Sequence, residues 1–175
     1  MRLLAAVPGS LLWLKHDGDE ARENLRAAAA ARGIDPARLF FAGKIEGEAA
    51  HLGRYRAADL FLDTLPYNAH ATACDALWAG LPLITCRGKS FAGRVSASLL
   101  QAVGLPELVT QSLETYEARA LELARDPAQL QALAEKLTRN LPTAPLFDAD
   151  RFARNIEAAY VTISEQRGNP HSFSG

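Results

Sequence analysis

The sequence has few cysteines, no excess of charge of either sign and no long apolar run. Only Cys74 and Cys86 occur among its 175 residues, too few for a disulfide framework or a cysteine-rich metal cluster. With 19 basic and 20 acidic side chains the net charge is −1, so the basic excess typical of nucleic-acid-binding proteins is missing. The composition therefore excludes disulfide-rich scaffolds and predicts no nucleic-acid partner and no metal site.

Membrane and export signals are also missing. No apolar run reaches the roughly 20 residues that a membrane-spanning helix needs. The N-terminal stretch has a short apolar run but lacks the small-residue cleavage site of a signal peptide. Together with the shortage of cysteine, these absences favour a cytoplasmic protein without a membrane partner.

Two common phosphate-binding motifs are absent. No Gly-x-Gly-x-x-Gly follows an apolar run, which argues against a nicotinamide dinucleotide site. Gly88-Lys89-Ser90 resembles the end of a P-loop, but that motif needs a glycine where Leu83 stands. A nucleotide site in this chain must therefore be built in another way.

Short apolar runs alternate with longer helical stretches along the chain. Near-continuous apolar strands that alternate with helices are typical of parallel sheets covered on both faces. The fold class predicted is therefore α/β, with a Rossmann-like parallel sheet and C-terminal helices, in one domain (1–166) with a loose tail (167–175). The predicted strands are 11–14, 39–41, 60–62, 83–85 and 108–109. The main predicted helices are 19–32, 46–58, 69–79, 91–103 and 148–165.

The segment after the third predicted strand combines several polar groups. Open α/β sheets bind ligands at the carboxyl ends of their strands. If Asn68 caps the next helix, the free backbone N–H groups of its first turn form an anion site, to which His70 and Thr72 add side-chain donors. Asp75, one turn later, is placed to accept hydrogen bonds from ribose hydroxyls. The alternative is that these residues only cap a helix and face solvent, and local spacing weighs the two interpretations equally.

His51 and Arg54 form a second candidate pair. Residues three apart on a helix share a face, where an imidazole can stack on a base and a guanidinium can pair with a phosphate or a base carbonyl. The alternative is a solvated helix face, which the spacing alone favours by roughly two to one.

Longer segments carry a family resemblance. The stretch 59–72, Asp-Leu-Phe-Leu-Asp-Thr-Leu-Pro-Tyr-Asn-Ala-His-Ala-Thr, continues into Asp-Ala-Leu-Trp-Ala-Gly-Leu-Pro at 75–82. It closely resembles the C-terminal catalytic lobe of the O-GlcNAc transferase family, glycosyltransferase family 41, in its bacterial form. The segments 94–100, 104–108 and 145–148 also match, and the resemblance runs from about Leu3 to the end. It implies the nucleotide-sugar-binding half of a GT-B glycosyltransferase.

The resemblance implies a role for each candidate residue. His51 corresponds to a histidine that packs on uracil, with Arg54 beside it. His70, Thr72 and the backbone N–H of Ala71 correspond to groups that hold the diphosphate, and Asp75 to the carboxylate that binds the ribose.

The sequence departs from the family pattern at two positions. The family usually has threonine where Ala71 stands, and alanine lacks the hydroxyl that would make one of the contacts. It also tends to have a lysine where Glu48 stands, so no lysine role is transferred. No residue of this chain is assigned as the catalytic base, and no cofactor or metal beyond the UDP-sugar substrate is implied.

The reaction implied is transfer of N-acetylglucosamine from UDP-GlcNAc to a serine or threonine of a protein acceptor, with inversion. The alternatives are a non-catalytic nucleotide-binding fragment, or another GT-B nucleotide-sugar enzyme such as an epimerase. In the family, the sheet order 3-2-1-4-5-6 places a first strand at the centre, and an N-terminal catalytic lobe and often a repeat domain precede it. The resemblance implies that all three are missing from this chain. We therefore expect either a split between the strands at 11–14 and 60–62 or direct pairing that closes it, and sugar transfer is not expected from this chain alone.

Overall fold

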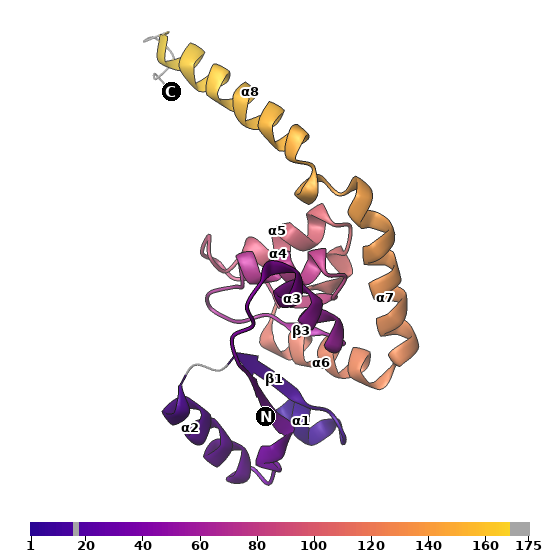
Figure 1. The fold of residues 1–175 in the computed structure, drawn as a ribbon. Coiled ribbons are helices and arrows are strands. Elements are labelled where there is room, and N and C mark those ends of the chain that lie inside the picture. Colours follow the sequence, from indigo (N-terminus) through magenta and orange to yellow (C-terminus); the bar gives the residue numbers. More distant parts are fainter. Residues whose placement is uncertain (16–17, 169–175) are drawn as a thin grey trace.

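The computed structural model describes residues 1–15 and 18–168 and consists of parallel strands alternating with helices (Figure 1). The strands are β1 (Leu12–Lys15), β2 (Leu39–Ala42), β3 (Phe61–Leu62), β4 (Leu83–Cys86) and β5 (Val109–Thr110). The α-helices are α1 (Arg2–Ala6), α2 (Asp19–Ala30), α3 (Glu48–Gly53), α4 (Ala71–Trp78), α5 (Val95–Ala102), α6 (Leu113–Arg125), α7 (Pro127–Asn140) and α8 (Ala149–Gly168). The 3-10 turns are η1 (Pro36–Arg38), η2 (Arg54–Ala57), η3 (Pro106–Leu108), η4 (Leu141–Thr143) and η5 (Pro145–Phe147). The predicted α/β fold class is confirmed.

The strands form two separate parallel sheets. One contains β1 and β2, and the other has the order β3-β4-β5. Within the described residues, no ladder joins β1 to β3, so of the two expected outcomes the structure has the split and not direct pairing. Among the described residues, β1 pairs only with β2 and β3 only with β4, so each has one edge without a ladder partner, where unpaired backbone groups favour the addition of a further strand. That a first strand fills the gap stays a prediction.

Each sheet has its own hydrophobic core. Helices α4, α5 and α6 contact β4, which is buried along its whole length. The largest buried side chains of this core are Leu77, Leu83, Leu100, Leu105, Leu108, Leu123 and Leu137. Burying a leucine contributes about 1.5–3 kcal/mol, so this core carries most of the apolar stabilisation. The smaller core contains Leu4, Ala29, Ile34 and Leu39.

Strand β1 is less buried than its apolar sequence predicts. Leu12 and Leu14 pack against the smaller core. Trp13 instead contacts Phe40 of β2 edge-on, with ring centroids 5.9 Å apart, and Phe40 is 57% exposed. Successive side chains of a strand point to opposite faces, and only one face of this sheet is covered. The expectation that both faces are covered is therefore wrong for β1 and β2.

The helices predicted at 46–58 and 91–103 begin later than expected. The helix predicted at 46–58 begins at Glu48, after Gly47 with φ +87°, and tightens into the 3-10 turn η2. The helix predicted at 91–103 begins at Val95 because the preceding residues form a closed loop. In that loop the N–H of Gly88 donates to the carbonyl of Gly93 over 2.6 Å. A Cβ at Gly93 would lie 3.0 Å from the carbonyl oxygen of Pro66, so the β4–α5 loop packs closely on the loop that follows β3.

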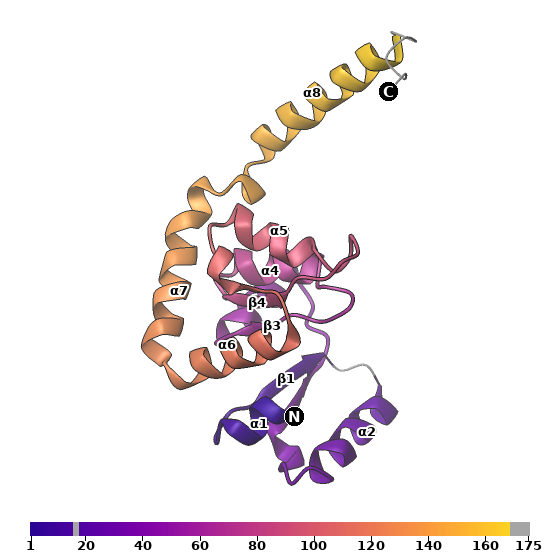
Figure 2. The ribbon, with the colours of Figure 1, turned by 180° about the vertical axis from the view of Figure 1, so that it is seen from behind.

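The two cores are linked through α1 and α6. The guanidinium of Arg2 forms an ion pair with Glu117, with Nη2 and Oε2 2.6 Å apart, and Arg125 donates to the carbonyl of Ala6 over 3.3 Å. In both views α8 projects away from the body of the molecule (Figures 1 and 2), and all of its described side chains are exposed. It continues to Gly168, so Arg167 and Gly168 of the predicted tail are helical, and its other residues, 169–175, lie outside the described residues.

Candidate functional site

The loop from Thr64 to His70 leads from β3 to the N-terminus of α4. Asn68, the predicted cap, is 1% exposed, and its side-chain amide donates to the carbonyl of Thr64 over 2.9 Å. Its backbone N–H donates to the carbonyl of Ala92 over 3.0 Å. The side chain is therefore committed to the loop, and the prediction that it caps the helix is wrong. His70 occupies the N-cap position, and no side-chain capping bond is formed there.

The first turn of α4 presents free backbone donors. The carbonyl of His70 accepts from the N–H groups of Ala73 and Cys74, each over 3.1 Å. Within the described residues, the N–H groups of His70, Ala71 and Thr72 have no hydrogen-bond partner. Ala71 and Thr72 are exposed. Free N–H groups at a helix N-terminus favour bound anions, so the predicted anion site has the backbone it requires.

The ring of His70 is held by residues of two loops, the loop that follows β3 and the β4–α5 loop. Its Nε2 atom lies 3.4 Å from the carbonyl oxygen of Ala92, so a hydrogen bond there requires the proton on Nε2 and leaves Nδ1 for another partner. Tyr67 stacks on the imidazole, with ring centroids 4.7 Å apart and planes at 20°. Phe91 meets the imidazole edge-on at 6.3 Å. Tyr67 and Phe91 are 63% and 77% exposed, and neither is among the predicted site residues.

His51 lies beside Asp75. The Nε2 atom of His51, on α3, is 3.6 Å from the Oδ2 atom of Asp75, on α4, and both side chains are about one-third exposed. An imidazole and a carboxylate at this distance attract when the imidazole is protonated. The structure therefore joins one predicted uracil contact to the predicted ribose contact across two helices.

Arg54 lies near His51 through a shared aromatic neighbour. The guanidinium carbon of Arg54 lies 5.6 Å from the ring centroid of Tyr55, and the ring of His51 meets Tyr55 edge-on at 5.8 Å. Within the described residues Arg54 has no ion pair, so its charge is available to a ligand.

Cys74 borders the same turn but offers little nucleophilic character. Burial raises the pKa of the Cys74 thiol, and the charge of Asp75 raises it further. The thiol therefore stays protonated at neutral pH, and the thiolate is the reactive form. Among residues 1–15 and 18–168, no three His, Cys, Asp or Glu side chains are grouped to hold a metal ion. In the same ranges, none of the helices combines the length and the apolar character of a membrane span.

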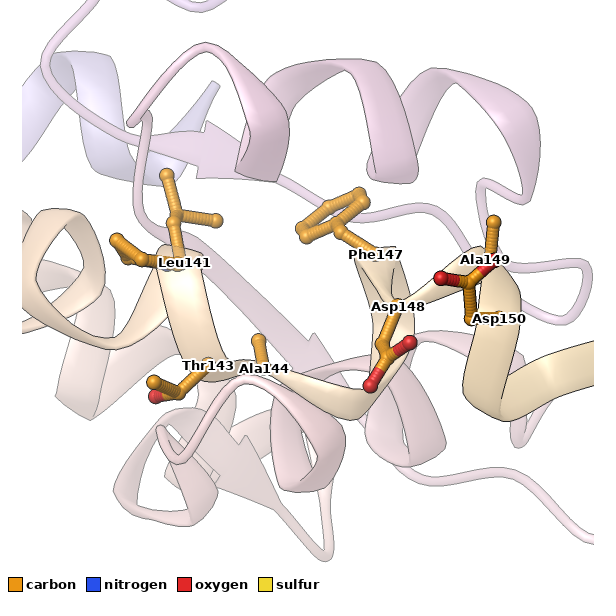
Figure 3. A pocket seen from close by; sticks show the side chains of 8 residues that line it. Leu141, Thr143, Ala144, Phe147, Asp148, Ala149 and Asp150 are labelled. Atoms are coloured by element: carbon orange, nitrogen blue, oxygen red, sulfur yellow. The ribbon is translucent and has the colours of Figure 1, made fainter.

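A separate hollow of about 330 Å³ lies between the end of α7 and the start of α8 (Figure 3). Asp148 and Asp150 contribute two carboxylates to it, and none of its described lining residues is basic. One carboxylate oxygen of Asp148 accepts the N–H of Arg151 over 2.8 Å at the start of α8. Two carboxylates repel a diphosphate, so this hollow does not fit the ligand that the first turn of α4 favours.

Comparisons with known proteins agree with the sequence resemblance. The family model described as glycosyl transferase family 41 matches residues 1–156. A probable UDP-N-acetylglucosamine–peptide N-acetylglucosaminyltransferase of Arabidopsis thaliana, SEC, is 39% identical over 92% of this chain. A Caenorhabditis elegans protein named for the same activity is 34% identical over 90% of this chain. The chain spans 16% and 14% of the lengths of these two relatives.

A solved structure is also similar. A mutant of the Thermobaculum terrenum O-GlcNAc transferase superposes with a TM-score of 0.84 at 35% identity. The match covers 91% of this chain and 31% of that protein. The predicted GT-B fold is thus supported by overall geometry as well as by sequence.

Proposed function

This chain belongs to glycosyl transferase family 41, and we propose that it forms the UDP-binding part of an inverting glycosyltransferase. The donor proposed is UDP-N-acetylglucosamine, and the acceptor is a serine or threonine of another protein. The relatives named for this activity support the proposal, as does the arrangement of polar groups around α4.

In this proposal the diphosphate binds at the N-terminus of α4. The free N–H groups of Ala71 and Thr72 donate to phosphate oxygens, where the helix dipole also favours negative charge. The side chains of His70 and Thr72 supply further donors. Ala71 supplies only its backbone N–H, because its methyl side chain has no hydroxyl.

The nucleoside binds between α3 and α4. His51 packs on uracil, Arg54 lies beside the base, and Asp75 accepts hydrogen bonds from the ribose hydroxyls. The observation that carries this assignment is the 3.6 Å distance between His51 and Asp75, because base and ribose contacts must adjoin in one nucleoside site.

The chemical contribution of this part is stabilisation of the leaving group. As the bond between sugar and diphosphate breaks, negative charge grows on the departing phosphate oxygen. Donors already aimed at that position stabilise the charge without reorganising during the reaction. Inversion requires the acceptor hydroxyl to attack from the opposite side of the sugar, so the acceptor and its base would lie across from α4.

The direct test is calorimetric binding of UDP and ADP to this chain. The two ligands share the diphosphate and differ in the base, so a preference for UDP reports on His51 and Arg54. Equal binding of both nucleotides would contradict the proposed nucleoside site.

A further inference from the structure

Ala69, the residue immediately before the N-cap of α4, is held at both ends of its backbone. Its N–H donates to the Oδ1 atom of Asp63 over 2.7 Å, and its carbonyl accepts the hydroxyl of Ser96 over 3.0 Å. Ser96 is fully buried. The peptide that enters the proposed phosphate site is therefore fixed by side chains from two other parts of the chain.

The Asp63 carboxylate is itself firmly anchored. It is 7% exposed, and its Oδ2 atom accepts the hydroxyl of Thr85, a fully buried residue of β4. Burying a carboxylate is costly unless its oxygens accept hydrogen bonds, and here both do. The same two bonds tie the end of β3 to β4 and to the start of α4.

The backbone of Asp63 has a further support. Its carbonyl accepts the hydroxyl of Tyr116, on α6, over 3.1 Å. Burial raises the pKa of Tyr116, and the charge of Asp63 raises it further, so the hydroxyl remains a donor throughout the physiological range. Asp63 is thus connected to β4, to α6 and to the loop before α4.

We propose that Asp63 is a positioning residue for phosphate, which holds the Ala69 peptide so that the next free N–H groups converge on one anion. This inference rests on the proposed function. Asp63 itself is buried behind the loop and does not contact the ligand. Substitution of Asp63 should therefore weaken phosphate binding and leave nucleoside binding unchanged, since the nucleoside contacts come from α3 and from Asp75 further along α4.

The experiment separates phosphate binding from nucleoside binding by comparing UDP with uridine. Affinities of the full chain for both ligands are measured by NMR titration, which also reports the amide shifts of residues 69–72. Asp63→Ala removes both acceptor oxygens. Asp63→Asn keeps one side-chain oxygen that accepts from the N–H of Ala69, and its NH2 group can donate to the hydroxyl oxygen of Thr85. Thr85→Val removes one donor to Asp63, and Thr110→Val is the matched control, because the Thr110 hydroxyl donates to the Thr85 carbonyl and does not touch Asp63.

We expect Asp63→Ala to lower the ratio of UDP to uridine affinity on the order of tenfold, the effect of about one charge-assisted hydrogen bond. Uridine affinity should stay within about twofold, less than the worth of a single hydrogen bond. Asp63→Asn should restore most of the ratio, Thr85→Val should lower it, and Thr110→Val should leave it unchanged.

Three results would overturn the positioning role. One is a folded Asp63→Ala chain with the wild-type ratio, and another is equal loss of UDP and uridine affinity. If Asp63→Ala does not fold, an unchanged ratio in Thr85→Val overturns it instead. A wild-type chain that binds UDP no better than uridine contradicts the proposed function and this inference together, whereas a normal wild-type ratio that is insensitive to Asp63 and Thr85 contradicts only the inference.

Discussion

The Nε2 atom of His51 lies 3.6 Å from the Oδ2 atom of Asp75, although the two residues belong to different helices. This distance places a side chain suited to a base next to one suited to a ribose. Spacing along one helix could not reveal the contact, because it depends on how α3 packs beside α4.

The first prediction concerns the ribose. If Asp75 binds the ribose hydroxyls, the wild-type chain should bind UDP more tightly than 2′,3′-dideoxy-UDP by about 1.5–3 kcal/mol, the usual worth of hydrogen bonds to a charged group. Asp75→Ala should abolish the difference, and Asp75→Asn should leave a smaller one. Calorimetry with both ligands measures it. A preference for UDP that survives Asp75→Ala would show that another residue binds the ribose.

The second prediction concerns Ala71, where the family usually has threonine. Ala71 is exposed in the first turn of α4, so a hydroxyl added there can reach the phosphate. Ala71→Thr should tighten UDP binding on the order of 1 kcal/mol. Ala71→Val, which has the same shape without the hydroxyl, is the control and should give no gain. Equal gains in the two variants would mean that shape, and not hydrogen bonding, is responsible.

The third prediction concerns stability at acid pH. Hydrogen bonds from Arg2 hold the pKa of Glu117 below its ordinary value. A carboxylate whose pKa is lowered by folding stabilises the folded state above its unfolded pKa, about 4.3 for glutamate. That contribution is lost as the pH falls through the lower, folded pKa. The effect should be small, because the Arg2 side chain is 80% exposed and solvent screens the pair.

Thermal melting of the wild-type chain and Glu117→Gln between pH 7 and pH 3 tests this prediction. The variant should melt at a lower temperature at pH 7, and the difference should shrink below about pH 4. Glu165→Gln changes an exposed carboxylate of α8 that has no ion pair within the described residues, and it should match the wild type throughout. A difference for Glu117→Gln that does not vary with pH would count against the ion pair.

The fourth prediction concerns catalysis. The chain spans about a sixth of the length of the curated relatives, and none of its residues is assigned as the acceptor-activating base. We therefore expect no sugar transfer from UDP-N-acetylglucosamine to a protein acceptor by this chain alone. A labelled-sugar transfer assay with the purified chain measures this directly, and clear turnover would refute it.

Much of the fold could be predicted from the sequence because its strands are short apolar runs separated by helices. Element boundaries that depend on contacts between separate segments of the chain could not be predicted from the sequence. The α4 helix was predicted from Ala69 but begins at Ala71, since Asn68 bonds to Thr64 and Ala92 instead of capping the helix.

The candidate site shows the same division. Local spacing left His70, Thr72 and Asp75 evenly balanced between a ligand site and an ordinary helix start, and the family resemblance gave them roles. Neither the local spacing nor the family resemblance indicated that Tyr67 stacks on His70 or that Asp63 anchors Ala69. The position of Asp63, directly after β3 and six residues before Ala69, was the available signal for the second contact.

The measurement that tests the central claim most directly is calorimetric titration of this chain with UDP and with ADP, repeated for His70→Ala. We predict that UDP binds more tightly than ADP and that His70→Ala weakens UDP binding by about 1.5–3 kcal/mol, with the variant's melting temperature confirming that it is folded. Equal affinity for the two nucleotides, unchanged by His70→Ala, would contradict the account.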